Sequence, residues 1–109
     1  MDYWTGTVYT TNRRVWEHDE EFKEYLRQTR IMAIDMETAT IFVVGFMNDI
    51  PHGALLLVSD NPMTPDGVKT AESDLKVTSN FVNKHLQIGI DSLLEIMNSG
   101  ESVKHLRFE

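Results

Sequence analysis

Three carboxylates lie where apolar segments of this 109-residue chain end. Asp35 and Glu37 follow the apolar run 31–34, and Asp60 follows the apolar run 54–59. Short apolar runs are typical of buried strands, and open α/β sheets bind their ligands at the carboxyl ends of their strands. The pattern therefore predicts one pocket that carries acids on two sides.

Each acid also has a structural interpretation. Carboxylates at a strand-to-helix junction often cap the helix. Asp35 and Glu37 therefore either cap or accept hydrogen bonds from two hydroxyls, as sugar recognition requires, and Glu37 reaches further. Asp60 precedes Asn-Pro, a common turn start. Its alternative role is general acid, which needs partial burial to hold a proton near neutral pH. The residues alone leave these roles open.

Side chains shortly before and between these acids could complete the pocket. Arg13 and Arg14 are either solvated loop cations or a guanidinium pair that holds a phosphate or a purine edge beside Thr11. Trp16 is either a packing anchor or a surface on which a base stacks. Met36 lies between the first two acids and would face whatever they bind. A phosphate or a purine is the ligand class that these residues would suit.

Composition excludes several classes of function. The sequence has no cysteine, so disulfides, thiolate metal sites and cysteine nucleophiles are excluded, and the 4 histidines lack metal-ligand spacing. A balance of 17 acids against 10 bases gives a formal net charge of -7, which argues against nucleic acid as a partner. The first residues predict no signal peptide, and no apolar run approaches the ~18 residues of a membrane span. We expect a cytoplasmic protein that binds no membrane.

Hydrophobic periodicity predicts alternating strands and helices, and hence an α/β fold. The expected strands are 4–10, 31–34 and 54–59, the expected helices are 18–30, 37–47 and 71–98, and a polar tail is 101–109. The loop 61–70 is long for a compact domain and is either functional or mobile. Gly100 is a natural helix stop. Three strands make a narrow sheet, so another segment or subunit should cover its edges.

Four runs carry a resemblance to a known family. The run 33–40, Ala-Ile-Asp-Met-Glu-Thr-Ala-Thr, resembles the Met-Glu segment of the nucleoside phosphorylase superfamily. The run 58–60, Val-Ser-Asp, resembles the Ser-Asp strand end of the same superfamily. The runs 6–17 and 85–90 are similar to the AMP nucleosidase branch, which hydrolyses AMP to adenine and ribose 5-phosphate. Together the resemblance covers about 6–91.

The resemblance implies a fold, a substrate and two alternatives. Residues 1–109 would be the C-terminal part of a nucleoside phosphorylase-like α/β sandwich with a mixed, mostly parallel sheet, without the N-terminal phosphate-side half. The substrate would be AMP or a related purine nucleotide or nucleoside, attacked by water with neither metal nor cofactor. Open sheet edges favour a homo-oligomer. The alternatives are a purine nucleoside phosphorylase and a catalytically incomplete fragment that binds nucleotides or associates with subunits.

The same resemblance implies roles for the site residues. Asp60 would protonate purine N7 as general acid, and Glu37 would accept hydrogen bonds from the ribose hydroxyls. Lys76, with Lys69 as its rival, would tune Asp60 from the start of the last helix. Asp35 would either orient the attacking water or cap the helix. The implied substrate-binding set is Met36, Asp35, Ser59, Thr11, Arg13, Arg14, Trp16 and Lys76.

Overall fold

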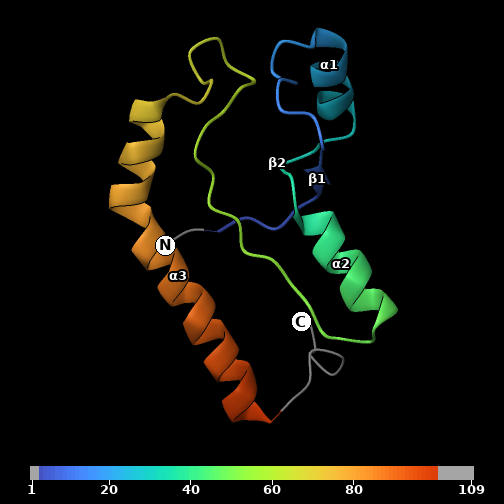
Figure 1. Ribbon diagram of the computed structural model, residues 1–109, viewed down its shortest axis with the longest axis vertical. Coiled ribbons are helices and arrows are strands. Elements are labelled where there is room, and N and C mark those ends of the chain that lie inside the picture. Colours follow the sequence, from blue (N-terminus) through green and yellow to red (C-terminus); the bar gives the residue numbers. More distant parts are fainter. Residues whose placement is uncertain (1–2, 101–109) are drawn as a thin grey trace.

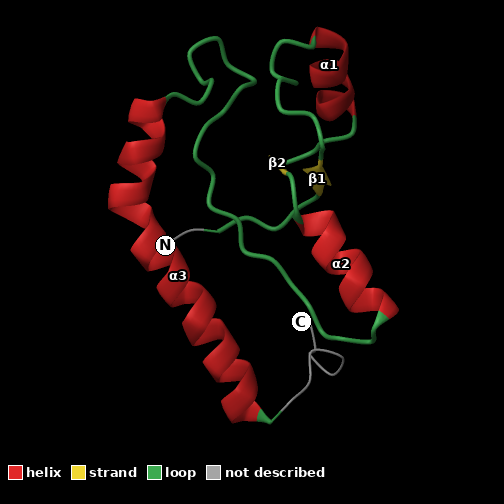
Figure 2. Ribbon diagram, viewed as in Figure 1, coloured by secondary structure: helices red, strands yellow, loops and turns green. Residues whose placement is uncertain are grey.

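The computed structural model describes residues 3–100, which contain two strands and three helices (Figures 1 and 2). In chain order these are β1 (Val8–Thr10), α1 (Glu20–Gln28), β2 (Ala33–Asp35), α2 (Thr38–Met47) and α3 (Ala71–Ser99). The three predicted helices are confirmed, with ends that differ by no more than two residues. The mixed helix and strand content and the parallel pairing confirm the α/β class. The predicted tail 101–109 lies outside the described residues.

β1 and β2 form a two-stranded parallel sheet. The register pairs Val8 with Ala33, Tyr9 with Ile34 and Thr10 with Asp35. Just beyond the ladder, the Thr11 N–H donates to the Asp35 carbonyl oxygen over 2.9 Å. Both strands therefore end at the same level. Because the carboxyl ends of parallel strands meet at one edge of a sheet, the loop after β1 and the turn into α2 start close together.

Two strand predictions were wrong. The first strand begins at Val8, not at residue 4, and the segment 54–59 forms no strand. Among the described residues, the backbone of 54–59 makes no hydrogen bond with other backbone groups. A helix satisfies its backbone groups internally, whereas a strand is completed only by a neighbouring strand. The apolar sequence of 54–59 suits a strand, but no neighbour pairs with it in residues 3–100.

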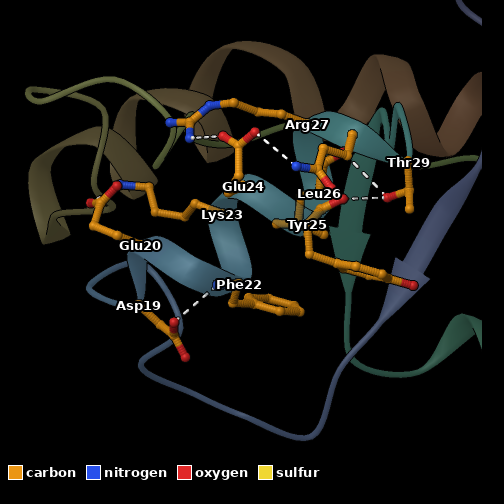
Figure 3. Close-up of polar contacts among 10 residues, drawn as sticks. Asp19, Glu20, Phe22, Lys23, Glu24, Tyr25, Leu26, Arg27 and Thr29 are labelled. Carbon is orange, nitrogen blue, oxygen red and sulfur yellow. Dashed lines mark hydrogen bonds and ion pairs between the residues drawn. The ribbon is translucent and has the colours of Figure 1, made fainter.

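α1 packs an aromatic face against β1. Its first turn is capped by Asp19, whose carboxylate accepts the Phe22 N–H over 3.0 Å (Figure 3). The ring of Tyr9 lies edge-on to the rings of Phe22 and Tyr25, with centroids 5.4 and 6.2 Å away. Leu26 is 3% exposed and is the one large apolar side chain in residues 3–100 that is buried. The packed core of the described chain therefore lies between α1 and the small sheet.

α2 and α3 leave most of their apolar side chains exposed. No residue of α3 is buried, and the helix stands apart from the sheet (Figure 1). Its ends are well defined, because Thr70 and Ser73 form a capping box and Gly100 adopts the left-handed conformation with φ of 68°. The predicted helix stop is thus confirmed. The large exposed apolar side chains of the two helices include Ile41, Phe42, Val43, Val44, Phe46, Met47, Leu75, Phe81, Leu86, Ile90, Leu93, Leu94 and Met97.

Candidate functional site

The carboxyl ends of β1 and β2 open onto a cavity of about 810 Å³. This volume lies in the range of ~300–1,000 Å³ that small-molecule sites occupy. The lining comes from the loop after β1, from residues 31–36 and 56–63, and from Leu26 and Lys69. The predicted site residues in the lining are Thr11, Arg13, Arg14, Trp16, Asp35, Met36, Ser59 and Asp60. Glu37 and Lys76 are not part of the lining.

Asp35 is held by hydrogen bonds from both sides of the sheet end. Its carboxylate accepts the Thr10 hydroxyl over 2.7 Å, the Thr38 N–H over 2.8 Å and the Thr38 hydroxyl. The Thr10 oxygen also accepts the Ala39 N–H over 2.9 Å, so β1, β2 and α2 meet at this point. Burial raises the pKa of Asp35, but the hydrogen bonds from Thr38 and Thr10 outweigh it and hold the pKa below its usual value. Asp35 is an ionised group that caps the first turn of α2.

Met36 and Glu37 form the short turn between Asp35 and Thr38, which are joined by hydrogen bonds. Met36 lines the cavity and is 42% exposed. Glu37 precedes α2 with non-helical φ and ψ of -130° and -25°, and its side chain makes no capping hydrogen bond. Within residues 3–100 its carboxylate has no hydrogen-bond or ion-pair partner. The turn is therefore fixed by its neighbours, and the Glu37 carboxylate remains available as an acceptor.

Asp60 has a sparser environment than Asp35. The carboxylate is half-buried in the cavity wall and accepts the Ser59 hydroxyl over 2.5 Å. Ser59 lines the same cavity. No backbone N–H among the described residues donates to Asp60. One of its carboxylate oxygens therefore has no hydrogen-bond partner among the described residues.

Lys69 is the lysine that reaches this cavity. Its ammonium group lies 2.9 Å from the Asp74 carboxylate in the first turn of α3. The hydrogen bond that Lys69 donates to Asp74 raises the pKa of Lys69 and outweighs the opposing effect of burial, and the charges of Asp74 and Asp60 raise the pKa further. The family resemblance favoured Lys76 over Lys69, because Lys76 lies at the start of the last helix, where the family often places a basic residue. The structure brings Lys69, rather than Lys76, to the wall that carries Asp60.

The loop between Asp60 and Lys69 closes on itself. The Asn61 N–H donates to the Gly67 carbonyl over 3.0 Å, and the Gly67 N–H donates to the Thr64 carbonyl over 3.1 Å. Gly67 is required here, because a Cβ on this residue would overlap the Asn61 carbonyl oxygen. This closed loop, residues 61–67, returns the chain toward the cavity. Its Pro and Gly residues signalled a turn in the sequence, but not which lysine the turn would bring back.

Arg13 and Arg14 have different surroundings. The Arg13 guanidinium pairs with Asp19 at 2.7 Å and lies 5.3 Å from the centre of the Phe22 ring. The Phe22 N–H first, and Arg13 second, hold the pKa of Asp19 below its usual value. Arg14 is exposed at the cavity and forms no ion pair with the described residues. Arg13 is therefore largely committed to α1, whereas the fork of Arg14 is free for a ligand.

Trp16 and Thr11 contribute both packing and cavity surface. The Trp16 ring lies edge-on to Phe22 with centroids 5.9 Å apart, and Trp16 also lines the cavity. Thr11 is 7% exposed, and its hydroxyl accepts the Arg13 N–H over 3.1 Å. The packing and the ligand-facing interpretations of Trp16 are thus compatible. Thr11 mainly shapes the loop that carries the two arginines.

Residues 3–100 bring together no group of three or more His, Asp or Glu side chains that could hold a metal ion. In the same part of the chain, every helix is too short or too polar to cross a membrane. The cavity lining includes the partly free acid Asp60 and the ring of Trp16, together with three cations and three thioethers, which are Arg13, Arg14, Lys69, Met32, Met36 and Met63. Such a set can hydrogen-bond, protonate and stack on a small polar aromatic ligand.

Comparison with known proteins places the chain in a family. Residues 1–95 match the Phosphorylase superfamily, so the chain belongs to this superfamily, as its Met-Glu and Ser-Asp motifs predicted. AMP nucleosidase from Escherichia coli strain K12 is 38% identical to it over 90 residues, and AMP nucleosidase from E. coli O157:H7 is equally similar. The match covers 82% of this chain and 18% of each relative. The chain thus spans less than a fifth of the length of these curated relatives. No solved structure matches it significantly.

Proposed function

We propose that this chain supplies the nucleoside side of a site that hydrolyses AMP to adenine and ribose 5-phosphate. The observation that carries the proposal is the convergence of Asp60, Met36 and Arg14 on one cavity. The membership of the Phosphorylase superfamily and the similarity to AMP nucleosidase support the reaction class. Residues 1–109 would then be the C-terminal part of a larger phosphorylase-like domain.

Asp60 acts as the general acid in this mechanism. Cleavage of a purine N-glycosidic bond generates an oxocarbenium-like sugar and a poor anionic leaving group. Proton transfer from Asp60 to N7 neutralises the departing base. The Ser59 hydroxyl, 2.5 Å from one carboxylate oxygen, donates a hydrogen bond that stabilises the carboxylate left after the transfer. Positioned acid catalysis of this kind contributes typically ~100- to ~10,000-fold.

Glu37 holds the ribose through its 2′ and 3′ hydroxyls. Its free carboxylate lies one residue after Met36, which would pack against the sugar or base in the cavity. Asp35 fixes the turn that carries both residues through its bonds to Thr10 and Thr38. Hydrogen bonds to the ribose hydroxyls strengthen as positive charge develops on the sugar, so this contact serves the transition state more than the ground state.

The arginine loop reads the adenine edge, and Trp16 offers its ring to the base. Arg14 has the free guanidinium and is the stronger candidate of the two arginines. Lys69 is the better candidate for the cation that tunes Asp60, because both residues line the cavity. The charge of Asp60 also contributes to the raised pKa of Lys69. Lys76 remains a candidate only if binding rearranges the start of α3. The attacking water needs no metal or cofactor.

The complete activity requires polypeptide beyond this match, because the chain covers 18% of each relative. A suitable test protein is a chimera in which this chain replaces the aligned 90 residues of the E. coli K12 enzyme. Adenine release from AMP in phosphate-free buffer supports hydrolysis. A strict requirement for phosphate would instead identify a purine nucleoside phosphorylase. Nucleotide binding without any turnover would favour a binding or subunit-association role.

We also propose that the protein is cytoplasmic and that it forms a homo-oligomer.

A further inference from the structure

The first turn of α2 is capped from a neighbouring strand instead of by its own N-cap side chain. The first N–H groups of a helix have no intrahelical partner, and the N-cap side chain normally accepts the N–H of the second or third helical residue. Glu37 is the N-cap residue of α2, so Ala39 is the second helical residue. The Ala39 N–H donates to the hydroxyl oxygen of Thr10, in β1, over 2.9 Å. Thr10 therefore holds an amide that the Glu37 side chain would otherwise cap.

The Thr10 hydroxyl is fixed on its other side by Asp35. It donates to the Asp35 carboxylate over 2.7 Å while it accepts the Ala39 N–H. Asp35 lies opposite Thr10 in the parallel register and also accepts the Thr38 N–H over 2.8 Å. A hydroxyl held in this way accepts the amide with little further loss of rotamer freedom, whereas capping by the long, exposed Glu37 side chain would order that side chain.

We propose that Thr10 is a positioning residue that keeps the Glu37 carboxylate off the first turn of α2 and free for a ligand. The positive N-terminal end of a helix attracts a carboxylate at this position. While Thr10 accepts the Ala39 N–H, no hydrogen bond reinforces that attraction, and the Glu37 side chain makes no capping contact. Without the Thr10 hydroxyl the amide loses its acceptor, and the N-cap side chain is the acceptor that helices ordinarily use.

The catalytic consequence rests on the proposed function, in which Glu37 holds the ribose hydroxyls. Thr10 does not line the cavity, so it is placed to act through Glu37 and not on the ligand itself. Loss of the Thr10 hydroxyl should divert Glu37 to the helix and weaken its contact with the 2′ hydroxyl. Selectivity for AMP over its 2′-deoxy analogue is therefore the kinetic property that Thr10 controls.

Hydrogen exchange at the Ala39 amide tests this change of cap without any substrate. In the chimera defined above, Glu37→Ala alone should leave the amide protected, because Thr10 still accepts it. Thr10→Val removes that acceptor but keeps the shape of the side chain, and Glu37 should then protect the amide. The variant with both substitutions should exchange at Ala39 at least ~10-fold faster than Thr10→Val alone. Equal exchange in these two variants would overturn the proposal, whether or not the chimera is active.

Adenine release supplies the second readout. Thr10→Val should lower kcat/KM for AMP at least ~10-fold and should lower the ratio of kcat/KM for AMP to that for 2′-deoxy-AMP at least ~3-fold. Thr10→Ser restores the hydroxyl and should return both quantities to within ~3-fold of the unmodified chimera. Thr7→Val is the matched control, because Thr7 is exposed just before β1 and its hydroxyl bonds to no described residue. An unchanged selectivity ratio, or a loss that serine does not restore, would overturn the proposal.

The unmodified chimera separates this proposal from the proposed function. If it releases no adenine from AMP, the proposed function fails, and the exchange of the Ala39 amide still decides the role of Thr10. If it is active and Thr10→Val keeps its selectivity, the proposed function stands and the role of Thr10 fails.

Discussion

Asp35 and Asp60 each follow an apolar run, yet the two regions have reached different states. The run before Asp35 pairs with β1, and its acid accepts hydrogen bonds from Thr10 and Thr38. The run before Asp60 has no strand partner among the described residues, and its acid accepts one hydroxyl, that of Ser59. The hydrogen-bond donors around Asp35 give it a structural role in the fold. Asp60 has fewer such donors, so more of its carboxylate is left to accept a hydrogen bond from a ligand.

This difference has a thermodynamic side. A carboxylate that accepts several hydrogen bonds stabilises the fold in its ionised form. A half-buried carboxylate that accepts one hydrogen bond contributes less to stability. A substitution of Asp35 should therefore change mainly the free energy of unfolding, and a substitution of Asp60 should change mainly the turnover rate. The following experiments test that division, beginning with the largest effect.

The 109-residue chain on its own should be inactive. We expect the isolated 109-residue chain to release no adenine from AMP and to associate at high concentration, because the apolar faces of α2 and α3 are exposed. Sedimentation velocity and an adenine-release assay measure the two halves of this expectation. A monodisperse monomer with full hydrolase activity would contradict both halves of this prediction.

Glu37→Gln in the chimera should lower kcat/KM at least as much as loss of the general acid. The neutral amide cannot stabilise the sugar hydroxyls as positive charge develops, so kcat should fall more than AMP affinity. Glu72→Gln, at the exposed start of α3, is the matched control and should leave the rate unchanged. The 2′-deoxy analogue of AMP should be a poor substrate of the unmodified chimera. Its cleavage at the rate of AMP would rule out a hydroxyl clamp.

Asp60→Asn should keep AMP binding within a few-fold and lower turnover by ~100- to ~10,000-fold. The asparagine side chain preserves size and one acceptor oxygen but cannot deliver a proton to N7. Asp66→Asn, in the loop that follows and outside the cavity lining, controls for charge removal and should have little effect. Single-turnover rates and equilibrium binding separate the two quantities. Near-normal turnover of the Asp60 variant would remove its role as the acid.

Arg14→Ala distinguishes two ligand contacts. If Arg14 reads the adenine edge, the variant should lose equal amounts of kcat/KM on AMP and on adenosine. If it grips the phosphate, only AMP should suffer, by ~1.5–3 kcal/mol or roughly 10- to 150-fold. Arg13→Ala should have the smaller effect, since its guanidinium already pairs with Asp19. A variant of Arg14 that behaves like wild type on both substrates would make it a surface charge.

Asp35→Asn should lower the free energy of unfolding of the chain. Loss of the charged acceptor removes charge-assisted bonds and should cost ~1–3 kcal/mol of the free energy of unfolding, measured with urea. The folded-state pKa of Asp35 is lowered from 3.8, so its stabilisation is complete above that value and is lost as pH falls through the folded-state pKa. The gap between wild type and variant should therefore narrow below pH ~3.8. A gap independent of pH would mean that the charge contributes nothing.

The sequence predicted elements whose hydrogen bonds are local and missed those that depend on a neighbour. The three helices and the Gly100 stop were signalled by periodicity or capping residues, whereas the strand predicted over 31–34 lies at Ala33–Asp35. The segment 54–59 looked like a strand because composition reports burial preference, not the presence of a partner. Eight of the ten predicted site residues lie in the cavity lining, but most of the 20 lining residues, Met32 and Met63 among them, were not in the predicted set. The choice between Lys69 and Lys76 depended on loop closure, which residue types alone do not encode.

The closed loop 61–67 has a consequence for how this half of the site is delivered. Its internal hydrogen bonds fix the path from Asp60 to Lys69 without help from the sheet. The chain separation between Asp60 and Lys69 is nine residues, but the closed loop removes most of that length from the path between them. A substitution that opens the loop, such as Gly67→Ala, should therefore disturb the cavity wall at both residues, although neither is itself changed.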